Sequence, residues 1–356
     1  MAIVAHSYPY VIGVDTHARN HTYAILAAGT GELLAAEEFP TTHAGFRRAL
    51  AWAARLTGGD MGALWVIECV ATYGTRLARA VADAGYEVAE AARMDARGHR
   101  SVGKSDPLDA HRIAAAVLPL DVTRLRRPRA DDGVRAALRV LTTAREQMST
   151  ERTSCVNALT ALLRAVDLGT DARKPLTNAQ IREVAAWRTR AEELALSVAR
   201  AEAVRLAKRI GVLDEELADN QAQLKALIKQ SQAAPLLDKT GIGPVTAAVV
   251  YAAWSHPGRV RTEAAFAALA GVSPIPASSG NTTRHRLNRG GDRRLNRALH
   301  MATVTRMTHH PETRAYVERR RAEGRTTKEI RRCLKRYLAR RIYRTLEAIH
   351  AEPSPA

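Results

Sequence analysis

Four acidic residues of the sequence stand where strands end or a helix begins. Asp15 and Glu68 each come directly after a short apolar strand, and Asp106 and Asp109 open a helix three residues apart. Residues at that spacing share one helix face, so both aspartates can point the same way. If the two strands are neighbours in one sheet and the helix packs across them, we expect the four carboxylates to converge.

A cluster of four carboxylates repels itself unless cations neutralise it. Two hard divalent ions about 4 Å apart would do so, and would activate an attacking oxygen and stabilise a leaving one. We therefore expect Mg²⁺, with Mn²⁺ as the alternative ion, at Asp15, Glu68, Asp106 and Asp109. A structural interpretation stays open: Asp106-Pro107 is a good helix start, Asp15 fits a turn, and Glu68 fits a buried ion pair.

A second candidate for chemistry is Ser279, in a loop of Pro, Ser, Gly and Asn just before a basic run. A hydroxyl beside a glycine can approach a phosphate closely, and guanidinium groups would stabilise the charge of a transition state. By composition alone this segment is an ordinary loop. The basic run supplies the predicted phosphate contacts, which are Arg284, Arg286, Arg289, Arg293 and Arg294.

Gly241 and Gly243 form a Gly-x-Gly between two predicted helices. Such a hairpin can hold a DNA phosphate on its backbone amides without reading sequence. An ordinary glycine-capped turn has the same pattern, so we keep both interpretations.

The elements that must position the first four acids follow a definite order. Apolar runs and turn residues predict strands over 10–14, 22–28 and 33–39, a helix from about residue 42, a strand over 63–67, a helix over 75–84 and a strand over 86–91. A three-stranded meander followed by alternating helices and strands is the order of a ribonuclease H-like fold. The fold class expected for the N-terminal part is therefore α/β.

From about Asp132 the pattern is helical, so the rest of the chain is expected to be all-α. Apolar residues from Ala203 to Leu227 recur by threes and fours, as in a coiled-coil heptad seam, and Asn220 is the kind of polar seam residue that fixes register and partner number. We expect a homo-oligomer built through this segment. The alternative is a long helical hairpin packed within one subunit.

The charge of the chain is strongly positive and uneven. Lys and Arg number 54 against 36 Asp and Glu, and residues 284–344 alone hold 20 Lys or Arg and 5 Asp or Glu. A basic surface confined to one end indicates a phosphate-bearing partner, above all nucleic acid. We find no membrane-length apolar run and no signal peptide. The three widely spaced cysteines argue against a disulfide framework and fit a reducing cytoplasm, and we expect a cytoplasmic, nucleoid-associated protein.

Taken in order, these motifs resemble the insertion-sequence transposases of the IS110 type, over most of the chain. The resemblance rests on residues 13–15, 67–68 with 73–74, 103–110, 241–247 and 271–296. The first motifs are individually weak, but their order together with the last one is specific. One departure is Ala71-Thr72, which stands where many relatives have a Thr-Gly pair after the glutamate.

The resemblance implies a RuvC-like N-terminal domain in which Asp15, Glu68, Asp106 and Asp109 form a DEDD metal-binding set. It also implies that Ser279, or Ser278 as the alternative, attacks the DNA phosphodiester and leaves a covalent phosphoserine and a free 3′ hydroxyl. Members of the family look like site-specific recombinases that act on element ends and target DNA, guided by a structured RNA encoded beside the gene. They assemble as dimers or tetramers, so that acids of one subunit meet the serine of another.

We therefore expect three domains: a RuvC-like domain over 1–130, long helices with heptads over 131–234, and a basic, mostly helical transposase domain over 235–350 that carries the serine. Two other functions stay open. A junction endonuclease would use the same four acids with water as nucleophile. A non-catalytic nucleic-acid-binding protein would use the acids only to cap helices and to form ion pairs.

Overall fold

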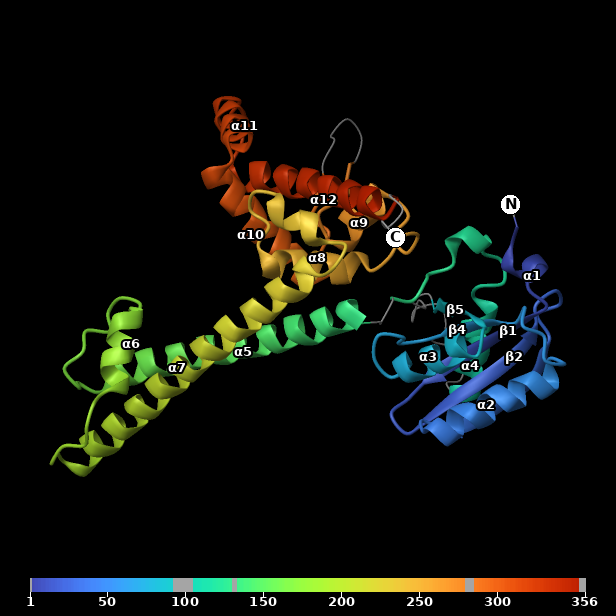
Figure 1. Cartoon of the computed structure of the whole chain (residues 1–356), viewed down its shortest axis with the longest axis horizontal. Helices are drawn as coiled ribbons and strands as arrows, with labels where there is room; N and C mark the ends of the chain where they lie inside the picture. Colours follow the sequence, from blue (N-terminus) through green and yellow to red (C-terminus); the bar gives the residue numbers. More distant parts are fainter. Residues whose placement is uncertain (1, 92–104, 130–132, 279–284, 352–356) are drawn as a thin grey trace. The chain divides into compact units, whose positions relative to one another are not determined.

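The computed structural model describes residues 2–91, 105–129, 133–278 and 285–351 of the chain (Figure 1). The chain divides into two compact units, Met1–Arg129 and Ala130–Ala356. The predicted regions 131–234 and 235–350 both fall within the second unit. Among the described residues, no helix is apolar over enough of its length to cross a membrane.

A five-stranded mixed sheet forms the centre of the first unit. Its strands are β1 (Tyr10–Thr16), β2 (Asn20–Ala27), β3 (Leu33–Pro40), β4 (Leu64–Ile67) and β5 (Glu87–Glu90), in the order β3-β2-β1-β4-β5. The first three strands form an antiparallel meander, and β4 and β5 run parallel to β1. The strands lie where the sequence predicts them, so the expectation of an α/β N-terminal part is confirmed.

Helices cover both faces of this sheet. On one face α2 (His43–Leu56) and α3 (Thr75–Asp83) pack over Ile12 and Val14, and on the other α4 (Asp106–Ala115) packs over Val11. The short helices α1 (Val4–Ser7) and η1 (Val122–Arg124) lie at the edge of the second layer. The alternation of β1 side chains between the two layers decides which of its residues face α4.

Two long antiparallel helices, α5 (Gly133–Ala165) and α7 (Leu194–Lys229), lie side by side in the second unit (Figure 1). The predicted seam residues Leu206, Ile210 and Asn220 are buried against α5 and the small helix α6 (Asn178–Ala185) of the same chain. The Asn220 amide donates to the Leu141 carbonyl at 3.0 Å. The seam therefore closes within the chain, which is the hairpin alternative rather than the coiled coil between subunits.

The remaining helices gather around the apolar helix α8 (Pro244–Trp254). They are η2 (Ala234–Asp238), α9 (Glu263–Leu269), α10 (Arg293–His309) and α12 (Thr327–Ala351), and α11 (Pro311–Ala322) packs against α10 and α12, so this part is mostly helical as expected. Two very short strands, β6 (Ile275–Pro276) and β7 (His285–Arg286), pair in an antiparallel hairpin that the sequence patterns do not predict. Helices α6 and α9 are likewise not predicted by the sequence patterns.

Candidate functional site

Asp15 and Glu68 lie at the same edge of the central sheet. Asp15 is next to last in β1, on the face that α4 covers, and is only 6% exposed. Glu68 follows β4, the parallel neighbour of β1, and its backbone N–H donates to the Val14 carbonyl at 3.1 Å. The structure thus brings these two acids together, in the way that neighbouring parallel strands bring their carboxyl ends together.

Gly13 decides how closely α4 approaches β1. A Cβ at Gly13 would lie 2.2 Å from the Ala110 carbonyl oxygen and 2.6 Å from the Ala114 nitrogen, so only glycine lets the helix backbone lie directly on the strand. This contact places the first turn of α4, which begins at Asp106 after the N-cap residue Ser105, beside the end of β1. The side chain of the N-cap residue Ser105 makes no capping hydrogen bond.

Burial raises the pKa of Asp15 to about 6, from an ordinary value of 3.8. The nearby His17 imidazole opposes the shift, whereas the carboxylates of Glu68 and Asp106 add to it, Glu68 by lying within hydrogen-bonding reach. Three acids that crowd one another in this way are the electrostatic signature of a site that binds a cation.

His17 is a member of this cluster that sequence reasoning missed. Single ligand atoms of Asp15, His17 and Asp106 lie within 4.8 Å of one another, and the His17 Nδ1 is 3.9 Å from the Asp15 Oδ2. The signal was present in the sequence, because a residue two places after Asp15 returns to the same face of an extended strand.

Asp109 is placed differently from the other three acids. Its carboxylate forms an ion pair with Arg112 at 3.0 Å on its own helix, and both side chains are mostly buried. Its backbone N–H donates to Ser105, as in a normal first turn. Asp109 therefore shares the helix with Asp106, as expected, but in this structure its charge is already balanced.

The turn after Glu68 has an unusual backbone. Cys69 has a φ of 48°, a conformation that side-chain-bearing residues rarely adopt, and its carbonyl accepts hydrogen bonds from the Thr72 and Gly74 amides. A Cβ at Gly74 would lie 2.6 Å from the Glu68 carbonyl oxygen. The tight turn that places Glu68 thus forms here with Ala71-Thr72.

The donor set of this cluster fits a hard divalent cation. Carboxylate oxygens are the ligands that Mg²⁺ and Mn²⁺ prefer, and one imidazole is compatible with Mn²⁺. Asp15, Glu68 and Asp106 are the residues that would hold such an ion. Asp109 would join them only after leaving Arg112.

The glycine-rich motif of the second unit forms a compact joint. The backbones of Gly271 and Gly291 touch, since a Cβ at Gly291 would lie 2.2 Å from the Gly271 nitrogen. Asp292 then caps α10 by accepting from the amides of Arg294 and Leu295. Asn296 donates to the Ala270 carbonyl at 2.7 Å. These contacts explain why the residues of the motif occur together.

The predicted phosphate-binding arginines fall into different environments. Arg286 and Arg289 line a cavity of about 490 Å³ beside this joint, and Arg293 is exposed at the start of α10. Ser279 and Arg284 lie outside the described residues, between strands β6 and β7. The alternative nucleophile Ser278 is the last described residue before them.

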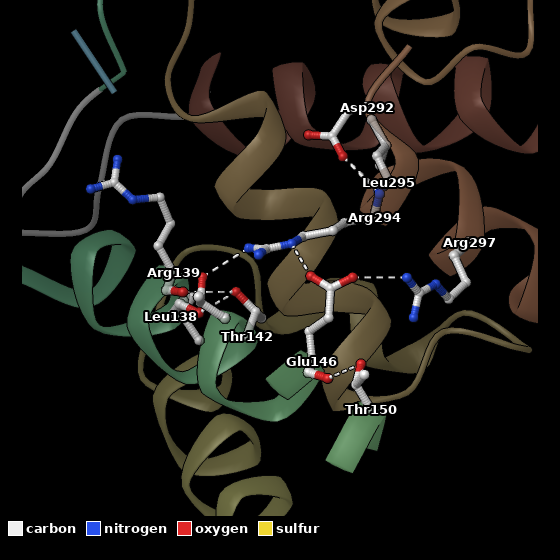
Figure 2. A network of polar contacts seen from close by, with 10 residues as sticks. Leu138, Arg139, Thr142, Glu146, Thr150, Asp292, Arg294, Leu295 and Arg297 are labelled. Atoms are coloured by element: carbon white, nitrogen blue, oxygen red, sulfur yellow. Dashed lines mark hydrogen bonds and ion pairs between the residues drawn. The ribbon is translucent and has the colours of Figure 1, made fainter. Parts of the chain in front are cut away.

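Arg294 is engaged with the long helical hairpin. Figure 2 shows Glu146 of α5 between Arg294 and Arg297 of α10: it pairs with Arg294 and lies 2.8 Å from Arg297. Arg294 also donates to the Thr143 hydroxyl at 2.8 Å. In this arrangement Arg294 joins α10 to α5, and a contact with nucleic acid would need it to leave Glu146.

The structure explains why residue 241 is a glycine. Its φ is +83°, and a Cβ there would lie 2.6 Å from the Ala302 carbonyl oxygen of α10. Gly243 is the N-cap of α8 and has open space where its Cβ would be. The glycine-capped-turn interpretation thus accounts for Gly241, whereas phosphate binding by this turn stays a prediction.

Comparison with known proteins agrees with this arrangement. A model described as "Transposase IS116/IS110/IS902 family" matches residues 233–318, and a model of the IS110 DEDD transposase matches residues 12–167, so that together they cover about two thirds of the chain. The second match includes all four acids, and the first includes Ser279.

Two proteins of insertion elements are similar to the chain. An uncharacterized 42 kDa protein of insertion element IS900, from Mycobacterium paratuberculosis, is 28% identical over 77% of this chain and 76% of its own length. An uncharacterized 43.6 kDa protein of IS110, from Streptomyces coelicolor, is 32% identical over 34% of this chain and 30% of its own length. The chain thus belongs to the IS116/IS110/IS902 family of transposases, which bind, cut and transfer DNA.

Proposed function

We propose that this transposase cuts and rejoins DNA through Ser279, assisted by divalent metal ions that Asp15, Glu68, Asp106 and Asp109 hold. The observation that carries the proposal is the meeting of Asp15, Glu68 and Asp106 at one edge of the sheet, where burial, together with the carboxylates of Glu68 and Asp106, raises the pKa of Asp15. The strand order of the first unit supports a ribonuclease H-like fold, in which a metal site at this edge is expected.

The cleavage step balances without a further reactant. The Ser279 Oγ attacks the phosphorus of a phosphodiester, the new Oγ–P bond replaces the P–O3′ bond, and the hydroxyl proton is transferred overall to the departing 3′ oxygen. A bound divalent ion supplies Lewis-acid stabilisation of charge on phosphate oxygens. Rejoining is the reverse step with a different 3′ hydroxyl, so the energy of the broken bond is kept in the phosphoserine.

The family resemblance extends the proposal to partners. We infer a structured guide RNA, and a dimer or tetramer in which the acids of one subunit meet the serine of another. The basic C-terminal helices supply charge for both DNA and RNA. Oligomerisation would use surfaces other than the seam of α7, because that seam is already covered by α5 and α6.

A trapping assay tests this function. Purified protein, Mg²⁺, DNA of the element ends and the RNA transcribed beside the gene are incubated, and covalent protein–DNA adducts are scored on denaturing gels. We expect an adduct in wild type and in Asp83→Ala, which removes an exposed acid of α3. We expect none in Ser279→Ala or Asp106→Ala, and an unchanged adduct in Ser278→Ala.

The same assay distinguishes the two alternatives. Cleavage without an adduct, lost in Asp106→Ala but kept in Ser279→Ala, would identify a nuclease that uses water. DNA binding in all variants with cleavage in none would identify a non-catalytic binding protein.

A further inference from the structure

The N-terminal half of α12 carries a basic stripe that sequence reasoning did not single out. Lys328, Arg331, Arg332, Lys335 and Arg336 recur by threes and fours, so they share one face of the helix. Ile330, on the opposite side of the same turns of α12, is buried. A basic stripe of this kind can be an ordinary solvated face of a helix. The residues around it show whether it is suited to bind a ligand.

The stripe faces a cavity of about 490 Å³ rather than open solvent. Seven Lys or Arg side chains line this cavity, since Arg286 and Arg289 face the five of α12. His285 and His300 are also in the lining, and no Asp or Glu occurs among the described residues that form it. A space that collects this much positive charge without a carboxylate is suited to an anion with several charges.

The charges at the floor of the cavity are held close together without compensation. The Nε of Arg331 is buried and has no hydrogen-bond partner among the described residues. Burial and the neighbouring Arg331 lower the pKa of Lys335. Burial, Lys335 and Arg331 lower the pKa of His300. Elsewhere in the helical part arginines pair with acids, as Arg294 does with Glu146. Among the described residues of this cavity, no acid balances the positive charges in the same way.

Lys335 is held in place by the joint that Gly271, Gly291 and Asn296 form. Lys335 donates to the Asn296 Oδ1 at 2.6 Å, and the Asn296 Nδ2 donates to the Ala270 carbonyl at 2.7 Å. Asn296 therefore connects α12 to the Gly271 turn and aims the ammonium group. A site whose charged groups are positioned in advance binds more tightly than a flexible basic surface.

We propose that this cavity binds consecutive backbone phosphates of a DNA strand, with Arg331 and Lys335 at its floor and Lys328 and Arg332 at its rim. The inference deepens the proposed function and rests on it for the choice of DNA. Neutral bases carry no charge to match the cavity, whereas successive phosphodiesters carry one each. Pro274 and His285, which precede and follow Ser279 in the sequence, also belong to the lining.

The test is a binding measurement without metal, so that it does not depend on cleavage. Fluorescence anisotropy of a labelled six-nucleotide oligothymidylate is followed in EDTA, at several salt concentrations, with tripolyphosphate as competitor. Arg331→Gln/Lys335→Gln is compared with Arg314→Gln/Arg321→Gln, which removes the same charge from exposed positions of α11. Lys328→Gln/Arg332→Gln keeps the Lys335–Asn296 contact and serves if the first variant does not fold.

We expect the cavity variants to weaken binding at least tenfold and to lower the salt slope by about 1.4, the value for two phosphate contacts of a single strand. The α11 variant should weaken binding less than threefold. Equal losses in both variants, or no saturable binding by wild type, would overturn the proposal. Failure of the Ser279 adduct assay would not affect this result, and failure here would leave that assay intact.

Two further readouts sharpen the test. An oligouridylate of the same length should bind within threefold of the oligothymidylate, and a preference above tenfold for the RNA would overturn the assignment to DNA. Arg331→Gln should raise Tm at low salt by about 2 °C, because it relieves repulsion between like charges. A lower Tm with unchanged binding would make Arg331 a structural residue and sink the proposal.

Discussion

Gly13 of β1 and Ala110 of α4 lie backbone against backbone, so that any Cβ at Gly13 would meet the Ala110 carbonyl at 2.2 Å. Through this contact the sheet carries Asp15 and the helix carries Asp106 to the same place. The proposed metal site is therefore a consequence of how closely one helix can lie on one strand.

Gly13→Ala should push α4 away from β1. Overpacking of this kind costs about 1–3 kcal/mol of unfolding free energy, and the displaced Asp106 should weaken Mn²⁺ binding. Urea unfolding and titration calorimetry with Mn²⁺ measure the two effects. Gly29→Ala is the matched control, because a Cβ there has nothing within 4 Å, and it should change neither quantity. Equal behaviour of the two variants would contradict the role of Gly13.

Metal binding should depend on pH through Asp15, whose pKa is about 6. A metal ligand must lose its proton first, so Mn²⁺ affinity should rise from pH 5 to pH 7 and level off above. Calorimetry at fixed ionic strength checks this expectation. Asp15→Asn should bind Mn²⁺ weakly at every pH, and an affinity that stays flat from pH 5 to pH 7 in wild type would argue against Asp15 as a ligand.

Without metal, the same carboxyl should make stability fall with rising pH. Its folded pKa of about 6 lies above the ordinary value of 3.8, so the native protein binds the proton more tightly than the unfolded chain. This contribution is complete below pH 4 and is lost as pH rises through 6. In EDTA, Asp15→Asn should therefore gain Tm relative to wild type between pH 4 and pH 7.5. A constant Tm difference across that window would refute the mechanism.

Variants of Arg294 and Arg286 should distinguish an arginine that stabilises the fold from one that binds a ligand. Arg294→Gln breaks the pair with Glu146 and should lower the unfolding free energy by about 1 kcal/mol, with most of the loss absent in a Glu146→Gln background. Arg286→Gln, at the cavity, should leave stability unchanged and weaken oligonucleotide binding. If Arg294→Gln weakens binding without loss of stability, Arg294 contacts nucleic acid, as the basic run predicts.

Asn220 should matter for stability and not for assembly. Asn220→Ala leaves the Leu141 carbonyl and Arg145 without this partner, which should cost about 1–3 kcal/mol by urea unfolding. Light scattering after size-exclusion chromatography should give the same oligomeric state as wild type. A changed mass of the oligomer with unaltered stability would instead indicate that the α7 seam forms an interface between subunits.

The sequence by itself determined where the strands lie along the chain and where the acids stand relative to them. Strand alternation and helix starts are local patterns, so Asp15 and Glu68 at strand ends and Asp106 after Ser105 could be located from neighbouring residues alone. The excess of Lys and Arg likewise indicated a nucleic-acid partner, because net charge needs no fold to be counted.

Only the tertiary structure decided which groups balance one another. Glu146 meets Arg294, and Lys335 meets Asn296, across long stretches of chain. The α7 seam has the same pattern whether it packs on its own α5 or on a second subunit. Packing selects partners that lie far apart in the sequence, and no local sequence pattern indicates them. The Lys335 cavity could therefore not be predicted, because it forms only where α12 packs against the Gly271 turn.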